Sequence, residues 1–296
     1  LLVLAVLLWA GNTVLGRFAT LTQVPPIALN FWRWTVALII FAPLAIPKLR
    51  AQLPLVKKHW RYWGAFGLIT VAGFNSALYI GLQYTTAVQS SLINAALPII
   101  VLAGARIFLH QAITGRQIAG IAISIAGVAL IVLRGDLRSV GGLVLNIGDL
   151  WILAAVCLWA MQTVMLRFMP KGLDLVVFQV MAFLSGLAVL GPMYAVETLG
   201  GRPMPINGTA LLMVAYSGIA ASVIAFTCWN FGVMRVGPKT AGYIGNLFPV
   251  FGASLGILLL GESFHWFHAV GGALTLGGIY FASHVPAPPV AAAKSV

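Results

Sequence analysis

The sequence predicts an all-α membrane protein with ten transmembrane helices, built as two inverted repeats of five helices each. Three observations support this fold class: the composition, a series of apolar segments and an internal repeat. Of the 296 residues, 61% are hydrophobic and only 7% are charged, whereas soluble domains carry about 25% charged residues. So little charge cannot cover a water-facing surface, so we expect most of the chain to face lipid.

Ten apolar segments follow one another, separated by breaks of Pro, Gly and charged residues. Each transmembrane helix needs about 20 apolar residues, so about 200 residues suffice for ten helices and little is left for a soluble domain. The expected helices of the first half are 1–18, 26–46, 62–83, 86–109 and 116–134. Those of the second half are 148–168, 174–197, 209–234, 239–260 and 265–284.

The connections divide the chain into two halves and a tail. We expect a first five-helix repeat over 1–134, a linker over 135–147 and a second, inverted repeat over 148–284. The tail over 285–296, VPAPPVAAAKSV, is rich in Pro and Ala and is expected to be disordered. Because the chain starts inside an apolar segment, a signal peptide is the alternative interpretation of its first residues. The repeat argues against that alternative.

Basic residues predict the orientation in the membrane. The net charge is +12, but the Lys and Arg residues lie between apolar segments rather than on an aromatic-interleaved polar surface, so nucleic acid is not the expected partner. The connection 47–61 alone holds five of them. Cytoplasmic connections are rich in Lys and Arg, so this connection and both termini are expected in the cytoplasm. With ten helices, 12 basic residues fall inside and four outside.

The two halves match when the chain is shifted on itself by about 150 residues. Leu8-Trp9-Ala10 then falls on Leu158-Trp159-Ala160, and Pro98 falls on Pro249. Each half has five helices, and five is an odd number, so the second half must enter the membrane upside down. Inverted repeats around a site near the bilayer midplane are a transporter architecture, because two such halves can exchange conformations and open the protein to either side.

Four stretches resemble the drug/metabolite transporter superfamily, in its EamA group. They are LLWAGNTVLGRFA (7–19), FWRW (31–34), ALYIGLQYTTAVQSSLINAALPIIVLAGARIFLHQ (77–111) and TCWNFGVMRVGPKTAGYIGNLFPVFGASLGILLLGES (227–263). The second long stretch has the family-like Leu-Gly-Glu ending at Glu262, whereas the first has Gln111 at the matching position. The resemblance implies a metabolite exporter, and exporters of amino acids, aromatic ones included, are prominent among its bacterial members.

Polar residues recur on one face of two repeat-related helices. These are Ser91 and Asn94 in 86–109, and Tyr243 and Asn246 in 239–260. Polar groups inside a membrane usually face a cavity or a partner helix, and Asn offers both a donor and an acceptor to a zwitterion. We predict that both faces line a central cavity. Hydrogen bonding between helices is the alternative role of the two asparagines.

Pro98 and Pro249 are expected in the middle of these two helices. Proline removes a backbone hydrogen bond and kinks a helix. Each position is therefore a candidate hinge, or a place where a free carbonyl faces the site. A static bend is the alternative.

Helices 1–18 and 148–168 carry matching sets of aromatic and polar residues. Each set lies on one helical face near the middle of its segment: Trp9, Asn12 and Thr13 in the first, Trp159, Gln162 and Thr163 in the second. Tryptophan normally anchors a helix at the membrane interface, which explains mid-segment positions less well. We predict an aromatic cavity wall.

Further substrate-binding candidates lie in the remaining central helices. Asn75 and Tyr79 are one turn apart in 62–83, and Trp229 and Asn230 lie in 209–234. Arg33 is the basic residue farthest from any expected helix end. Its guanidinium is a candidate partner for a substrate carboxylate. Snorkelling to the interface or pairing with backbone carbonyls are the alternatives.

No catalytic, metal or cofactor site is predicted. The five acidic residues lie near expected helix ends, so no ion coupling is visible. His265 and His268 lack a carboxylate-rich set beside them, so no metal is expected. Gly232 to Thr240 resembles a phosphate loop, but it lies between apolar helices rather than after a strand. Cys157 and Cys228 are expected to be packing residues.

The sequence as a whole predicts a secondary transporter of a bacterial inner membrane, not an enzyme. We expect it to export small amphipathic metabolites by alternating access, with amino acids as substrates. The alternatives are another metabolite or a toxic cation, such as a nucleobase, a sugar or a drug, and then a membrane enzyme or a channel. The oligomeric state stays open, and a monomer is sufficient for this architecture.

Overall fold

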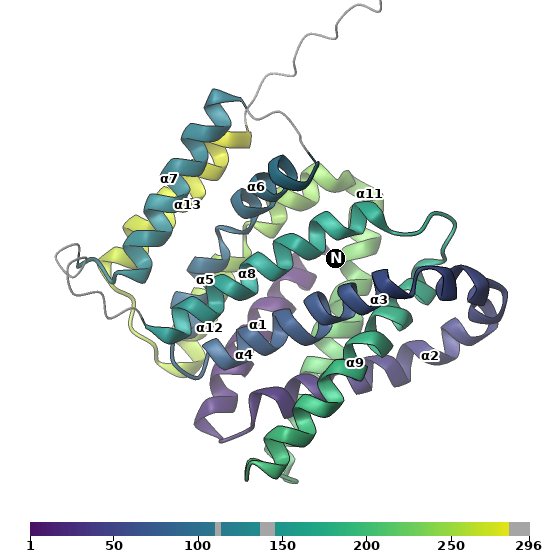
Figure 1. The fold of residues 1–296 in the computed structure, drawn as a ribbon. Coiled ribbons are helices and arrows are strands. Elements are labelled where there is room, and N and C mark those ends of the chain that lie inside the picture. The colour runs from purple at the N-terminus through teal and green to yellow at the C-terminus, as the bar shows by residue number, and fades with distance from the viewer. Residues whose placement is uncertain (110–113, 137–145, 284–296) are drawn as a thin grey trace, which may run out of the picture.

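The computed structural model describes residues 1–109, 114–136 and 146–283 (Figure 1). Every regular element within these ranges is helical, which confirms the all-α prediction. The predicted tail 285–296, position 111 and most of the predicted linker 135–147 lie outside the described residues.

The first half of the chain, in its described residues, contains seven α-helices and one π-helical segment. They are α1 (Leu2–Leu21), α2 (Pro26–Lys58), α3 (Trp60–Gly67), η1 (Leu68–Phe74), α4 (Asn75–Gly81), α5 (Ala87–Asn94), α6 (Leu97–Leu109) and α7 (Gly115–Val132). Because α3, η1 and α4 follow one another without a gap, they form one continuous span.

The second half, in its described residues, has six α-helices, one π-helical segment (η4) and one short 3-10 helix (η3). They are α8 (Ile147–Met165), η3 (Leu166–Phe168), α9 (Leu175–Leu199), α10 (Gly208–Ala215), η4 (Tyr216–Ile224), α11 (Ala225–Gly245), α12 (Phe248–Leu260) and α13 (Trp266–Ser283). A π-helical segment, η4, again lies between two α-helices of one continuous span.

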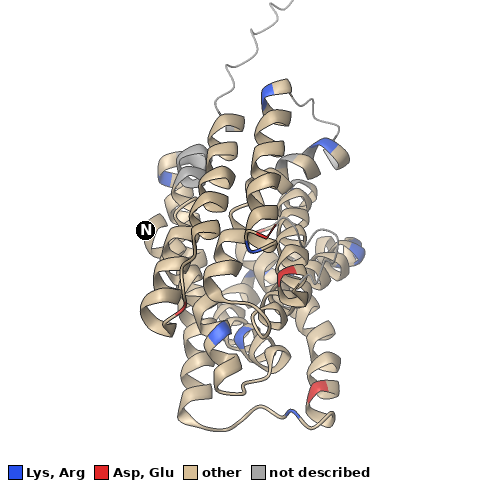
Figure 2. Ribbon diagram, turned by 90° about the vertical axis from the view of Figure 1, so that its left-hand side faces the viewer, with Lys and Arg blue, Asp and Glu red and all other residues tan. Residues whose placement is uncertain are grey.

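Seven described helical segments are long and apolar enough to cross a membrane. They are Leu2–Leu21, Pro26–Lys58, Trp60–Gly81, Gly115–Val132, Ile147–Met165, Leu175–Leu199 and Gly208–Val236. Ala87–Val101 and Phe248–Leu260 are apolar but shorter. Figure 2 shows few charged segments scattered over the ribbon. The chain is therefore an integral membrane protein by the length and composition of its helices.

The predicted end of the second helix near residue 46 is wrong. Helix α2 runs for 33 residues to Lys58 and contains Pro43, Pro47 and Pro54. The prediction treated prolines and basic residues as a break, but Lys and Arg are good helix formers and the helix continues beyond the length a membrane requires. The indole N–H of Trp63 donates to the Val56 carbonyl oxygen at 3.1 Å, and this hydrogen bond stabilises the last turn of α2.

Two further predicted boundaries are wrong, and both involve the candidate hinges. The expected helix 86–109 is broken at residues 95–96, and the expected break between 234 and 239 is absent, because α11 continues to Gly245 and the chain turns at residues 246–247. Pro98 and Pro249 are therefore not mid-helix. Each is the second residue of a new helix, where proline is tolerated because its missing N–H needs no partner there.

Helices α2 and α9 pack along each other and are fastened at both ends. Lys48 of α2 pairs with Asp174, which precedes α9, at 2.8 Å. At the other end, the Glu197 carboxylate of α9 accepts hydrogen bonds from the backbone N–H groups of Ile27 (3.3 Å) and Ala28 (2.7 Å) at the start of α2. Each helix thus stabilises the start of the other.

Helices α7 and α13 lie side by side as a separate pair (Figure 1). Their contact is made by glycines, because a Cβ on Gly127 would lie 2.5 Å from the Gly271 carbonyl oxygen and a Cβ on Gly120 would lie 2.6 Å from that of Gly278. Small residues let membrane helices approach this closely, and van der Waals packing then holds them together.

We expect Gly127→Ala to separate α7 from α13 and to lower the free energy of unfolding by roughly 1–3 kcal/mol, because the added methyl meets backbone rather than a flexible side chain. Thermal unfolding in detergent measures this change. Gly191→Ala in α9 is the matched control, since its Cβ meets no atom within 4 Å. An equal thermal midpoint for both variants would contradict the packing described here.

Candidate functional site

Arg33 of α2 lies at the centre of a buried hydrogen-bond network. Its side chain is 4% exposed. The Nε–H donates to Ser222 Oγ of η4 at 2.7 Å. The Nη1 group donates to Asn75 Oδ1 at 2.6 Å and to the Tyr79 hydroxyl oxygen at 3.1 Å, both on α4. The predicted Arg33, Asn75 and Tyr79 are therefore in direct contact.

The network continues from Tyr79 to α1. The Tyr79 hydroxyl, on a side chain that is 1% exposed, donates to Asn12 Oδ1 at 2.8 Å. One connected set of hydrogen bonds thus joins α1, α2, α4 and η4. Within the bilayer no water competes for these groups, so each bond left unmade costs several kcal/mol.

The π-helical segments expose backbone carbonyls that other helices bind. The indole N–H of Trp9 donates to the Ala221 carbonyl oxygen of η4 at 3.0 Å. The Asn30 amide of α2 donates to the Val71 carbonyl oxygen of η1 at 3.1 Å. The i→i+5 pattern widens a helix at one turn and is frequent at functional sites. Here it places Ser222 beside Arg33.

No carboxylate neutralises Arg33 in the described part of the chain. The ion pairs found there are Arg17 with Glu262 at 3.9 Å and Lys48 with Asp174 at 2.8 Å. The partners of Arg33 are neutral oxygens and the Trp34 ring, whose centroid lies 4.9 Å from Cζ. Cation–π contact and hydrogen bonds stabilise a buried guanidinium, but its positive charge persists and attracts an anion.

An aromatic cluster lies next to this network. The Trp9 ring is 6.1 Å from Trp159, 5.5 Å from Phe226 and 5.3 Å from Trp229, measured between centroids. These tryptophans pack on one another in the interior and are partly buried. The structure therefore brings the three predicted tryptophans together, as a wall would require.

The other predicted residues do not reach the network through hydrogen bonds among the described residues. Ser91 is buried against Gly252, and Asn94 donates to the Ser90 carbonyl oxygen of its own helix at 2.9 Å. Thr13 is buried, Thr163 bonds back to Trp159 O, and Gln162, Asn230 and Asn246 are partly buried. The side chain of Tyr243 lies outside the described part of the structure.

Sequence analysis missed Ser222 and Phe226. A usable signal for Ser222 was its position as a polar residue in the middle of the apolar run 209–234, because such residues face partners rather than lipid. Phe226 gave no signal that separates it from the other apolar residues of its helix.

The loop between α4 and α5 lies at the end of the molecule where α1 connects to α2. Hydrogen bonds from several other parts of the chain hold this loop in place. Arg17 Nη1 donates to the carbonyl oxygens of Leu82 (3.0 Å) and Gln83 (3.4 Å). The Asn146 amide donates to the Tyr84 carbonyl oxygen at 2.9 Å. The Glu262 carboxylate accepts from the Ala87 and Val88 N–H groups at 2.8 Å each. We call residues 82–86 the anchored loop.

A buried aspartate completes these contacts. Asp149 is 0% exposed and accepts from Thr85 Oγ1 at 2.6 Å and from Gln89 Nε2 at 2.9 Å. Gln89 Oε1 lies 3.1 Å from His268 Nε2. Because His268 Nδ1 accepts the His265 backbone N–H, Nε2 carries the proton that His268 donates to Gln89. The described residues include no group of three or more His, Cys, Asp or Glu that could hold a metal ion.

Comparisons with known proteins match nearly the whole chain. The family model described as the EamA-like transporter family matches residues 1–133 and 146–284. An uncharacterized transporter of Archaeoglobus fulgidus is 28% identical over 95% of both chains. A probable terminal-alkyne amino-acid exporter of Streptantibioticus cattleyicolor is 27% identical over 94% of this chain and 90% of its own. A probable amino-acid metabolite efflux pump of Salmonella typhimurium is 24% identical over 95% and 92%.

The fold also has a counterpart among solved structures. One crystal structure superposes with a TM-score of 0.61 at 18% identity, covering 95% of this chain and 96% of that chain. At this identity the match shows a shared fold.

We expect Tyr79→Phe to destabilise the protein by about 1–3 kcal/mol, since Asn12 Oδ1 loses its donor in a buried site while the ring stays in place. Thermal unfolding in detergent measures the effect. Tyr194→Phe is the control, because the Tyr194 hydroxyl accepts one exposed, 3.4 Å hydrogen bond from Trp32. Equal unfolding midpoints for the two variants would show that the network contributes little to stability.

Proposed function

We propose that this chain, which belongs to the EamA-like transporter family, is a secondary transporter that exports amino acids, aromatic ones included. Its family and its named relatives are transporters, so the chain is a membrane transporter and not an enzyme. We infer the substrate class from the site, and the direction of transport from the names of the Streptantibioticus and Salmonella relatives.

The buried guanidinium of Arg33 carries the substrate proposal. It has no carboxylate partner among the described residues, so an incoming carboxylate would find an unneutralised donor. The oxygens of the substrate carboxylate would accept hydrogen bonds from the Arg33 N–H groups that now donate to Ser222 Oγ and Asn75 Oδ1. The released amide and hydroxyl oxygens could then accept the substrate ammonium group, which suits a zwitterion.

The aromatic cluster beside the network favours substrates with an apolar or aromatic side chain. Trp9 links the aromatic cluster to the segment η4, which carries Ser222. Its indole N–H donates to η4, and its ring packs on Trp159 and Trp229. Edge-to-face aromatic contacts add about 0.5–1.5 kcal/mol beyond area burial. The names of the Streptantibioticus and Salmonella relatives, each of which mentions amino acids, support the same class.

The architecture that we propose for transport is ten helices in two inverted repeats, 1–134 and 148–284, joined by a linker. Support comes from the two separate matches of the family model and from π-helical segments at equivalent places in both halves. Breaks before Pro98 and Pro249 also correspond. We propose that they act as hinges for alternating access, with the site near the midplane.

The distribution of Lys and Arg supports insertion in a bacterial inner membrane with both termini in the cytoplasm. One copy contains both proposed halves, so the proposal needs no oligomer. Export of a toxic cation is disfavoured, because the unneutralised charge of Arg33 would repel it.

Counterflow into liposomes tests the function. Purified protein in liposomes loaded with unlabelled phenylalanine is expected to accumulate labelled phenylalanine transiently, and excess external unlabelled amino acid should suppress the uptake. Arg33→Gln removes the cationic anchor and is expected to reduce uptake at least about tenfold, the effect of losing a charged hydrogen bond of ~1.4 kcal/mol or more.

Arg50→Gln, on the exposed end of α2, is the matched control and should transport normally. Counterflow of no amino acid in a broad panel would contradict the substrate proposal. Normal counterflow by a folded Arg33→Gln protein would contradict the assigned site.

A further inference from the structure

We propose that a polar cavity on the outer side of the protein is a second amino-acid site, which receives the substrate carboxylate on Arg202 as the substrate leaves. The outer side is the end where α1 turns into α2, opposite the basic connection at the end of α2. The inference rests on the proposed function, because it names a further site for the same substrates.

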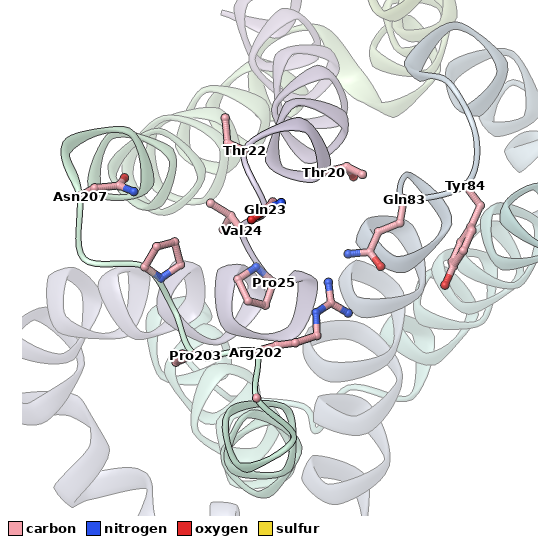
Figure 3. Close-up of a pocket in the computed structure, with 12 residues that line it drawn as sticks. Thr20, Thr22, Gln23, Val24, Pro25, Gln83, Tyr84, Arg202, Pro203 and Asn207 are labelled. Atoms are coloured by element: carbon pink, nitrogen blue, oxygen red, sulfur yellow. The ribbon is translucent and has the colours of Figure 1, made fainter.

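The cavity has a volume of about 710 Å³, within the range of about 300–1,000 Å³ that is typical of small-molecule sites. Its polar lining includes Thr20, Gln23, Gln83, Tyr84, Arg202 and Asn207. Figure 3 shows the side chains of Arg202 and Gln83 extending into the space from different walls. Three amides and one guanidinium therefore surround a space that fits an amino acid.

Arg202 gives the cavity its charge. Among the described residues that line it, Arg202 is the one charged side chain, and no aspartate or glutamate joins it. Glu197 is close enough to interact electrostatically with Arg202, but both oxygens of its carboxylate accept hydrogen bonds from the start of α2. A substrate carboxylate is thus the fitting partner for this guanidinium, and a cation is not.

The walls of the cavity are held in place before any ligand arrives. Gln83 and Tyr84 belong to the anchored loop, whose carbonyl oxygens are bound by Arg17 and Asn146. The backbone of Gln23 has a φ of 57°, in the left-handed region that residues other than glycine rarely adopt. Strain of this kind costs about 1–3 kcal/mol and persists only where the surrounding structure holds the backbone in place.

One face of α1 runs from the central hydrogen-bond network to this cavity. Asn12, Gly16 and Thr20 follow one face of α1 at intervals of one turn. Asn12 belongs to the central network, Gly16 packs against Tyr79 and Leu82, and Thr20 lines the cavity. Parting α1 from α4 along this face would join the two sites, so a substrate could pass from Arg33 to Arg202.

The recognition chemistry follows from the lining. The carboxylate would pair with Arg202, the side-chain amide oxygens of Gln23 and Gln83 could accept the ammonium group, and the Tyr84 ring offers a face to an apolar side chain. An amino acid amide lacks the carboxylate and carries net positive charge, so we expect it to bind poorly.

Cysteine protection tests the cavity. Thr22→Cys, at a lining residue with no assigned role in binding, is introduced into a protein carrying Cys157→Ala and Cys228→Ala, and its reaction with a membrane-impermeant maleimide is timed in liposomes. Phenylalanine is expected to slow labelling roughly threefold when two thirds of the cavities are occupied, whereas phenylalaninamide should not. Adding Arg202→Gln should abolish the protection, and Arg202→Lys should restore part of it.

Ile206→Cys is the matched control, because residue 206 lies in the loop that carries Arg202, is 94% exposed and does not line the cavity. Its labelling should not respond to phenylalanine. Equal protection by the amide, protection that survives Arg202→Gln, or no protection at all would overturn the inference. Counterflow in the same liposomes separates the two proposals: counterflow without protection contradicts the cavity alone, and protection without counterflow contradicts the exporter alone.

Discussion

The structure depends on one buried positive charge. Burying a guanidinium away from water is strongly unfavourable unless its donors are satisfied. Here Ser222 of η4 and Asn75 and Tyr79 of α4 supply the acceptors, so they come from two distant parts of the chain. The requirement to satisfy Arg33 therefore fixes how α2, α4 and η4 meet, and Tyr79 extends the constraint to α1.

The acidic residues explain why this charge stays unneutralised. Glu197 and Glu262 bind the backbone N–H groups at the starts of α2 and α5, and Asp174 binds Val176 N–H at the start of α9. Asp149 is held by Thr85 and Gln89. Carboxylates at helix starts are favoured by the unpaired N–H groups and the helix dipole. Four of the five acidic residues are thus engaged away from Arg33, and none of them neutralises its charge.

Much of the fold and part of the site could be predicted from the sequence. Composition and apolar segments predict membrane helices because lipid imposes one simple requirement on length and polarity. Arg33 was identifiable because a charged residue far from any helix end is costly in a membrane and usually has a function. Trp9 and Trp159 were identifiable because they occupy matching positions in the two halves.

Other features depend on tertiary contacts that no local pattern records. The continuation of α2 past Pro47 is stabilised by contacts such as that of Trp63 with Val56 O. The turns before Pro98 and Pro249 leave no local signal beyond the prolines, which suit a kink as well as a helix start. Ser222 reaches Arg33 because η4 is π-helical, and the sequence of η4 does not distinguish π from α.

Recognition of a substrate carboxylate by Arg33 can be measured in a thermodynamic binding cycle. Calorimetry would compare phenylalanine with phenylalaninamide on the native protein and on Arg33→Gln. We expect the preference for the carboxylate ligand to fall by at least ~1.4 kcal/mol, about tenfold, in the variant. An unchanged preference in a folded variant would show that Arg33 does not bind the carboxylate.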